Sequence, residues 1–453
     1  MREAPRLTAT RALGSSVVTK TTRIAALIAL FVLLPGCGSK TIAGGEQRKI
    51  AEPKYEASIE GIAVDRNGGV LVSWEDDDGA YERFAPPGKG WSRATTLVSG
   101  SRDSWGLDPS LAFNGRGERL AVWKDGMNLV LDVRRPGEER ARMRTMVSLA
   151  RDYAPEDVRV ATSTGCGFLV AADGTRTKKN GDETTTSFAF LVRCAPRWEA
   201  IRVDSKEGFL YPEPVFDAHD GPALFWVGSP VSGYFETPDW ERLVYVPIDA
   251  NGHASSPRKV AQFRRSDLTS SIFAVPGAQR PTCAVITRKG IVWQVTPKGM
   301  VRLVKIGGNE RDVIADADGN IVVAWSAAEL VGDVWISRVK GGRRVTEHVG
   351  TGSNPVIGRS GNRLFVGLQG WSDHQAIAYQ EGPSWLSVDP GDGEGRFLAA
   401  AGVRGGLFWT QRNFAFMGES VESTDIYAWL YPHPRGLVSA PLLGPARVPT
   451  RRG

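Results

Sequence analysis

The chain has 453 residues, of which 42% are hydrophobic and 23% charged, and its formal net charge is +6. Most of this charge belongs to residues 1–36, which carry five basic residues and one acidic residue. The rest of the chain therefore has a net charge near +2, and it contains no basic run with interleaved aromatic residues. This charge pattern gives nucleic-acid binding little support.

The first segment of the chain is expected to be a signal peptide. Basic residues precede the apolar stretch "IAALIALFVLL" at 24–34. This stretch is too short to span a bilayer, which requires about 20 apolar residues, but it has the length of a signal-peptide core. We therefore assign residues 1–36 to a signal peptide.

A possible lipid-attachment site follows directly. The sequence "LPGCGS" at 34–39 resembles the bacterial lipobox, although Pro35 departs from the small residue usual there. The resemblance implies cleavage before Cys37, a diacylglycerol thioether on its sulfur and acylation of the new amino terminus. Gly38 is not aspartate, which favours outer-membrane delivery. The alternative is a secretory signal with an incidental cysteine. On the lipoprotein interpretation, residues 37–54 form a lipidated tether that provides the chain's only contact with the membrane.

A short pattern recurs along the rest of the chain. It reads "DRNGGVLVSW" at 65–74, "NGRGERLAVW" at 114–123, "DAHDGPALFW" at 217–226 and "DADGNIVVAWS" at 316–326. Asp, Asn and Gly favour turns because they tolerate positive φ or bond to the local backbone. The apolar runs have strand length and no helical periodicity, so each copy predicts a β-hairpin.

The spacing of these hairpins predicts the fold. Their second strands end at intervals of 39–60 residues, and two further strand-like runs follow most of them. Four strands per repeat predict an all-β fold, a single β-propeller of four-stranded antiparallel blades over residues 55–445, with 446–453 as a flexible tail. Eight hairpins favour eight blades, with seven as the alternative. The Trp that ends many second strands is expected to pack between neighbouring blades.

This pattern resembles the degenerate propeller repeats of bacterial surface and envelope lipoproteins, and more loosely sialidase-type and WD-type blades. The resemblance covers most of residues 55–431 and implies the fold rather than an activity, because propellers include both binding modules and enzymes. The sialidase sequence Ser-x-Asp-x-Gly-x-Thr-Trp is absent.

Three cysteines follow Cys37. Cys166 and Cys194 lie symmetrically about Asn180-Gly181, a dipeptide that favours a hairpin turn, so we predict a disulfide between them. The alternative is a pair of buried free thiols. Cys283, in "TCAVIT", is expected to be a buried strand residue.

Loop lengths suggest which end of the propeller binds ligands. Turns within the first hairpin of each repeat are short, whereas many connections after the second strand and between repeats are long, and "EDDDG" at 75–79 belongs to this second group. Because scaffolds carry function on loops, we expect the loop-rich rim to be the binding face. Its candidate anchors are aromatic residues: Trp105, Tyr211, Tyr234, Phe235, Trp240 and Trp371.

The sequence gives little evidence for a metal, a cofactor or catalysis. Asp76 and Asp78 are weak calcium candidates, since consecutive acidic positions form a poor ligand set, and no cofactor is expected. Neither G-x-S-x-G nor H-E-x-x-H occurs. We therefore interpret the chain as a non-enzymatic, lipid-anchored envelope propeller, in the outer membrane, that binds a protein partner. The alternative is a carbohydrate-binding or sialidase-like glycan-cleaving propeller.

Overall fold

The computed structural model describes residues 39–430, with gaps of which the longest are 100–108, 202–207, 230–239, 389–397 and 415–420. The chain divides into two units, Met1–Ser39 and Lys40–Gly453, and the fold below is that of the second. No helix occurs among the described residues, and so none there could span a bilayer. The described strands all belong to antiparallel sheets, which confirms the all-β prediction.

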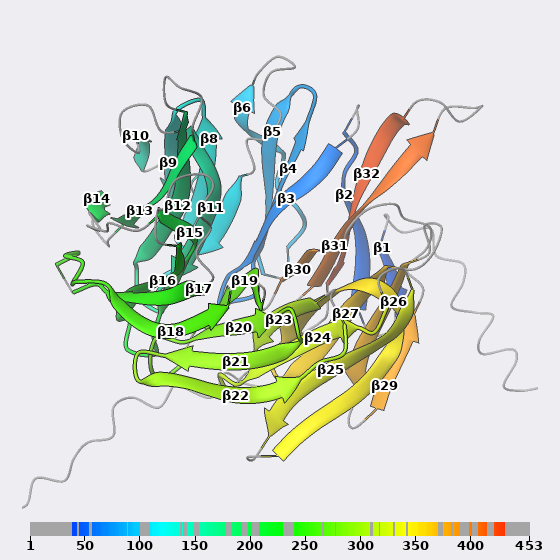
Figure 1. Cartoon of the computed structure of the whole chain (residues 1–453). Helices are drawn as coiled ribbons and strands as arrows, with labels where there is room; N and C mark the ends of the chain where they lie inside the picture. Colours follow the sequence, from blue (N-terminus) through cyan, green and yellow to red (C-terminus); the bar gives the residue numbers. More distant parts are fainter. Residues whose placement is uncertain are drawn as a thin grey trace, which may run out of the picture. The chain divides into compact units, whose positions relative to one another are not determined.

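Five four-stranded sheets follow one another in chain order, each pairing its strands consecutively (Figure 1). Sheet 1 contains β3 (Ala57–Val64), β4 (Val70–Asp76), β5 (Gly79–Ala85) and β6 (Thr95–Ser99). Sheet 2 contains β7 (Ser110–Phe113), β8 (Arg119–Asp125), β9 (Asn128–Arg134) and β10 (Met143–Ser148). Sheet 3 contains β11 (Ala154–Thr162), β12 (Phe168–Thr177), β13 (Glu183–Val192) and β14 (Trp198–Ile201). Sheet 4 contains β15 (Gly208–Phe216), β16 (Pro222–Ser229), β17 (Trp240–Pro247) and β18 (Arg258–Arg264). Sheet 5 contains β19 (Leu268–Ala274), β20 (Cys283–Thr287), β21 (Ile291–Thr296) and β22 (Gly299–Lys305).

The next sheet has seven strands because one long strand serves two ladders. Its strands are β23 (Arg311–Ala315), β24 (Ile321–Ser326), β25 (Gly332–Lys340), β26 (Arg343–Ser360), β27 (Arg363–Gln369), β28 (Gln375–Glu381) and β29 (Ser384–Val388). β26 pairs with β25 through its first half and with β27 through its second. Asn354, with φ of 42°, interrupts it near the change of partner. Because β26 is shared by the ladder with β25 and the ladder with β27, the seven strands form one continuous sheet. The number of blades, eight or seven, therefore stays a prediction.

A closing sheet joins the two ends of the described chain. It contains β30 (Leu398–Ala400), β31 (Gly406–Phe414) and β32 (Val421–Leu430), followed in space by β2 (Gly45–Ala51) and β1 (Ser39–Ile42). The ladder runs from Glu46↔Leu430 to Ala51↔Ile426, and Ile50 is only 1% exposed. Within the segment predicted as a tether, Ser39–Ile42 and Gly45–Ala51 are therefore strands of this sheet, and the role of the segment as a lipidated tether stays a prediction.

Buried clusters connect each sheet to the next. Strand residues alternate between the two faces of a sheet, so one strand contributes to two clusters. In β8, for example, Leu120 and Val122 pack toward sheet 3, whereas Ala121 and Trp123 pack toward sheet 1. The same sharing joins sheets 3 to 4, 4 to 5, 5 to the seven-stranded sheet, and that sheet to the closing sheet. The closing sheet in turn packs on sheet 1 through Phe408 and Val72. This unbroken circuit is a β-propeller.

The tryptophans at the ends of second strands occupy the predicted places. Trp74 packs against the closing sheet, Trp123 against sheet 1 and Trp226 against sheet 3, and each is at most 4% exposed. In every case the indole ring fills the interface with the preceding sheet. The repeated residue therefore marks an inter-sheet contact rather than a ligand site.

The first strand of each sheet lies on the inner side of the circuit. First strands contact one another, as in β3 with β7, β7 with β11, β11 with β15 and β15 with β19. Several contain a register shift at a similar level, including Pro155/Val158 in β11 and Leu210/Glu213 in β15. A bulge redirects the side chains that follow it. The residues just after these shifts therefore help to shape the inner wall.

Candidate functional site

The two ends of the strands differ in their connections. At one, which we call the turn end, the first strand of each sheet turns into the second and the third into the fourth. At the other, the connection end, the second strand turns into the third and the chain passes to the next sheet. The aromatic candidates were predicted to lie at the connection end.

The turn end is closed by a repeated hydrogen-bond pattern. In the turn after β3, Asp65 Oδ1 accepts from the backbone N–H groups of Asn67 and Gly69, each at 2.7 Å. Asn114, Asp217, Asp249 and Asp316 repeat this geometry with the residues two and four positions later. Each of these side chains serves its own turn, which is the reason that Asp or Asn recurs in the sequence pattern.

Neighbouring turns also bond to one another at this end. Gly115 donates to the carbonyl of Ser163 at 3.0 Å, and the Thr164 backbone N–H donates to Asp220 Oδ1 at 2.6 Å. Ala218 donates to the carbonyl of Ala278 at 2.8 Å. These bonds link the turns of sheets 2, 3, 4 and 5. The turns at this end are therefore fixed to one another by hydrogen bonds.

The aromatic candidates are only partly described. Trp105, Tyr234, Phe235 and Trp371 lie outside the described residues. Tyr211 lies in β15, at its register shift, so its assignment to a loop is wrong: a bulge resembles a loop in sequence because it breaks the alternation. Trp240 begins β17 at the connection end, is 43% exposed, and lies 5.6 Å from the Arg264 guanidinium carbon. Among the candidates that the structure describes, Trp240 is thus an exposed aromatic side chain beside a cation, and its role in binding stays a prediction.

The acidic segment 75–79 is a tight turn rather than an elaborated loop. Asp76 pairs with Gly79 in the ladder of β4 and β5, which leaves two residues in the turn. Asp76 is 8% exposed, and its Oδ1 accepts from the Asp78 backbone N–H at 2.9 Å. Across the described parts of the chain, no group of three or more His, Cys, Asp or Glu side chains is arranged to hold a metal ion.

The cysteines agree with the predicted hairpin. The ladder of β12 and β13 runs from Phe168↔Val192 to Thr177↔Glu183, which centres it on residue 180. Cys166 is disulfide-bonded, whereas Cys194 lies outside the described residues, so their pairing stays a prediction. Cys283 is a buried free thiol in β20, as expected, and burial raises its pKa well above the ordinary value.

A buried ion network joins sheets 1 and 2. Arg134 lies 2.6 Å from Glu82 Oε1 through Nη1 and 2.9 Å from Asp132 Oδ1 through Nε. All three residues are at most 4% exposed. Burial raises the pKa of Glu82, although the nearby guanidinium groups oppose this. Because these buried acidic and basic groups pair with one another, the cluster links sheets 1 and 2 and leaves little room for a ligand.

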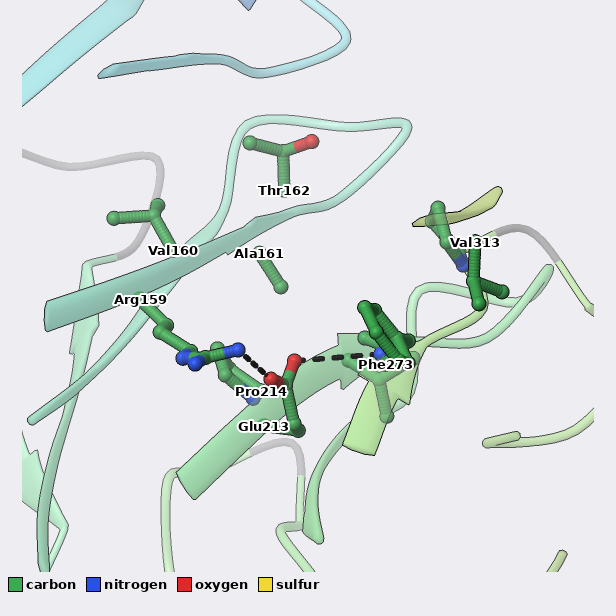
Figure 2. Close-up of a pocket in the computed structure, with 11 residues that line it drawn as sticks. Arg159, Val160, Ala161, Thr162, Glu213, Pro214, Phe273 and Val313 are labelled. Carbon is green, nitrogen blue, oxygen red and sulfur yellow. Dashed lines mark hydrogen bonds and ion pairs between the residues drawn. The ribbon is translucent and has the colours of Figure 1, made fainter. Parts of the chain in front are cut away.

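A cavity of about 340 Å³ lies along the inner strands (Figure 2). Residues from β11, β15, β19 and β23 line it, so four successive sheets contribute. The lining extends to Thr162 and Pro276, which places the cavity on the part of these strands that leads to the turn end. No sequence signal pointed to this cavity, because loop length marked only the connection end.

Glu213 is the only carboxylate among the described residues that line this cavity. It follows the register shift of β15, forms an ion pair with Arg159 of β11, and accepts at Oε2 from the Ala274 backbone N–H at 3.3 Å. Its side chain is 7% exposed, compared with 38% for Arg159. Burial raises the pKa of Glu213 to about 7, and Arg159 and the Ala274 N–H oppose the rise. The site thus holds a carboxyl group that titrates near neutrality beside a partly open guanidinium.

A second perturbed carboxylate, Asp312 in β23, has a different role. Its Oδ1 accepts from the Val313 N–H at 2.8 Å, and its Oδ2 accepts from the Ile357 N–H of β26 at 2.9 Å. Burial raises its pKa to about 6 despite these two bonds. Both oxygens are engaged by backbone groups, so Asp312 connects two inner strands.

Comparisons with known proteins find similar structures but no match in sequence. No protein-family model and no curated protein matches the sequence. Among solved structures, the chain is similar to puromycin hydrolase, with 11% identity, a TM-score of 0.48, and coverage of 80% of this chain and 60% of the hydrolase. The chain thus spans less than two thirds of that protein.

Two further solved structures are similar over most of the chain. The WD40 domain of SCAP from fission yeast has 9% identity and a TM-score of 0.49, with coverage of 86% of this chain and 99% of that domain. An alpha-L-arabinanase from Penicillium chrysogenum, complexed with arabinobiose, has 12% identity and a TM-score of 0.40, with coverage of 77% and 99%. These proteins include both an enzyme that acts on glycans and a WD40 domain, and at such low identities they assign no activity to this chain.

Proposed function

We propose that the chain is a non-enzymatic, lipid-anchored β-propeller of the bacterial cell envelope that binds a protein partner at its connection end. The observation that carries this proposal is the difference between the two ends. The turn end is occupied by bonds within and between turns, whereas the connection end carries longer segments and the exposed Trp240. Aromatic side chains of this kind are common anchors in protein interfaces.

The anchor belongs to the same proposal. Cys37 carries the lipid, and the outer membrane is the destination, as the lipobox resemblance implies. In the sequence, Cys37 lies two positions before β1, the first described strand of the closing sheet.

The experiment is in-cell crosslinking of the lipidated protein, followed by purification and mass spectrometry. The test variant combines Trp105→Ala, Trp240→Ala and Trp371→Ala, and the matched control is Arg66→Ala/Arg116→Ala, which changes two exposed turn-end residues. We expect a partner that the control retains and the test variant loses. A partner retained equally by both variants, or no specific partner, contradicts the proposal.

A second candidate, a glycan-binding or glycan-cleaving propeller, is supported by Glu213. A carboxyl group with a pKa of about 7 suits general acid catalysis, and it lines the cavity. Turnover of a fluorogenic glycoside by the natural protein, abolished in Glu213→Gln, would favour this candidate. Turnover unchanged by the substitution would remove Glu213 from consideration.

A further inference from the structure

Arg159 presents unused hydrogen-bond donors to the cavity. A guanidinium carries five N–H donors, and at Arg159 Nη1 binds Glu213 Oε1. Among the described residues, the Arg159 side chain forms no hydrogen bond or ion pair other than the one with Glu213. Its side chain is 38% exposed and lines the cavity, beside Glu213 in Figure 2. The remaining donors are therefore accessible to a ligand that enters the cavity.

The rest of the wall is mostly apolar. Phe273 of β19 and Val313 of β23 lie across the cavity from Arg159 in Figure 2, and Pro214 is beside Glu213. The volume of about 340 Å³ is near the lower end of the range typical of small-ligand sites, about 300–1,000 Å³. A small ligand with one charged group and an apolar body matches this lining.

The sign of the ligand's charge follows from the two ionisable residues. Glu213 is 7% exposed, and its oxygens already bind Arg159 and the Ala274 N–H, so it has little capacity for a cationic ligand. Arg159 is more exposed and has free donors. Arginine recognises carboxylates through two parallel N–H···O bonds.

We propose that this inner cavity is a carboxylate-binding site, in which Arg159 binds the carboxylate and Phe273 contacts the apolar body of the ligand. Glu213 orients the guanidinium and competes with the ligand for it. The site lies toward the turn end, so the inference does not depend on the proposed function at the connection end. Its ligand class is a small carboxylate, supplied by a peptide C-terminus or by an acidic sugar.

Calorimetric titration of the mature lipidated protein in detergent tests the site with two probes. N-acetylphenylalanine represents a peptide C-terminus and glucuronate an acidic sugar, and the primary amide of each is the neutral control. We expect one or both acids to bind and the amides to bind at least tenfold more weakly, because a hydrogen bond to a charged group contributes about a factor of ten or more. Equal binding of acid and amide, or no binding of either acid, overturns the proposal.

Three variants separate recognition from folding. Arg159→Met should abolish acid binding, whereas Arg159→Lys keeps the charge but loses the paired bonds and should weaken binding about tenfold. Glu213→Gln should strengthen binding, because it removes the competing negative charge. A purely structural role for the pair predicts weaker binding in Glu213→Gln, and that result, or wild-type affinity in Arg159→Met, refutes the assignment.

Discussion

Replacement of Glu213 by Gln should remove a defined part of the pH dependence of stability. The native carboxyl has a pKa of about 7, raised from an ordinary value of 4.5 chiefly by burial. Between these pH values the unfolded chain releases a proton that the native protein retains. The contribution of Glu213 to the free energy of unfolding is therefore largest below pH 4.5 and falls as the pH rises to about 7.

The size of this effect follows from the shift. Each pKa unit corresponds to about 1.4 kcal/mol, so a difference of roughly 2.5 units gives about 3 kcal/mol. Because Glu213 is buried, solvent screening reduces this value little. Glutamine does not titrate, and the free energy of unfolding of Glu213→Gln should therefore decline less with pH by about that amount.

Urea unfolding at pH 4, pH 6 and pH 8, followed by tryptophan fluorescence, measures the difference. The control is Asp312→Asn, because the pKa of Asp312 is raised to only about 6 from 3.8. Its effect should therefore lie mainly between about pH 4 and pH 6. If Glu213→Gln keeps the full pH dependence of the natural protein above pH 6, Glu213 is not the group that titrates near neutrality and the argument from its burial is refuted.

Substitutions at three further residues test the scaffold by the same unfolding assay. Trp226→Ala should lower the free energy of unfolding by about 3–5 kcal/mol, because it empties the contact between sheets 3 and 4; a loss below about 1 kcal/mol would contradict this packing role. Arg134→Met should cost about 3 kcal/mol since it removes the closest cation from the buried Glu82 and Asp132, and an unchanged midpoint would show that their remaining cations, Arg119 and Arg144, suffice. Asp316→Ala should cost about 1 kcal/mol through loss of its turn bonds, whereas Asp316→Asn should be nearly neutral; equal losses would argue against the turn mechanism.

The repeated parts of the fold were predictable from the sequence because their causes are local. An Asp with a Gly three positions later specifies a turn, because the Asp side chain accepts hydrogen bonds from backbone N–H groups of that turn, as at Asp65 and Asp316. Trp123 and Trp226 each end an apolar run of strand length, so the local sequence predicts that they are buried between sheets. The strand β2 was not predictable because its pairing with β32 joins residues nearly 400 positions apart, and no local signal marks that partner.

The cavity could not be predicted for a related reason. Arg159 and Glu213 lie 54 positions apart, and each follows a register shift that single-sequence periodicity does not reveal. Bulges break the alternation by which strands are recognised, and Tyr211 was placed in a loop for this reason. The residues that shape the inner wall are thus those at which the sequence pattern is weakest.

A raised pKa alone does not distinguish the cavity from the scaffold. Burial raises the pKa of both Glu213 and Asp312, yet the atoms that meet their oxygens differ. Asp312 is bound by two backbone N–H groups, which cannot move without the strands that carry them. Glu213 faces Arg159, a flexible side chain with donors to spare, so a ligand can take over part of its hydrogen bonding at little structural cost. The group that binds each carboxylate, rather than the pKa of that carboxylate, therefore distinguishes the two sites. In the inner cavity, the carboxylate of a ligand can replace Glu213 as an acceptor for Arg159.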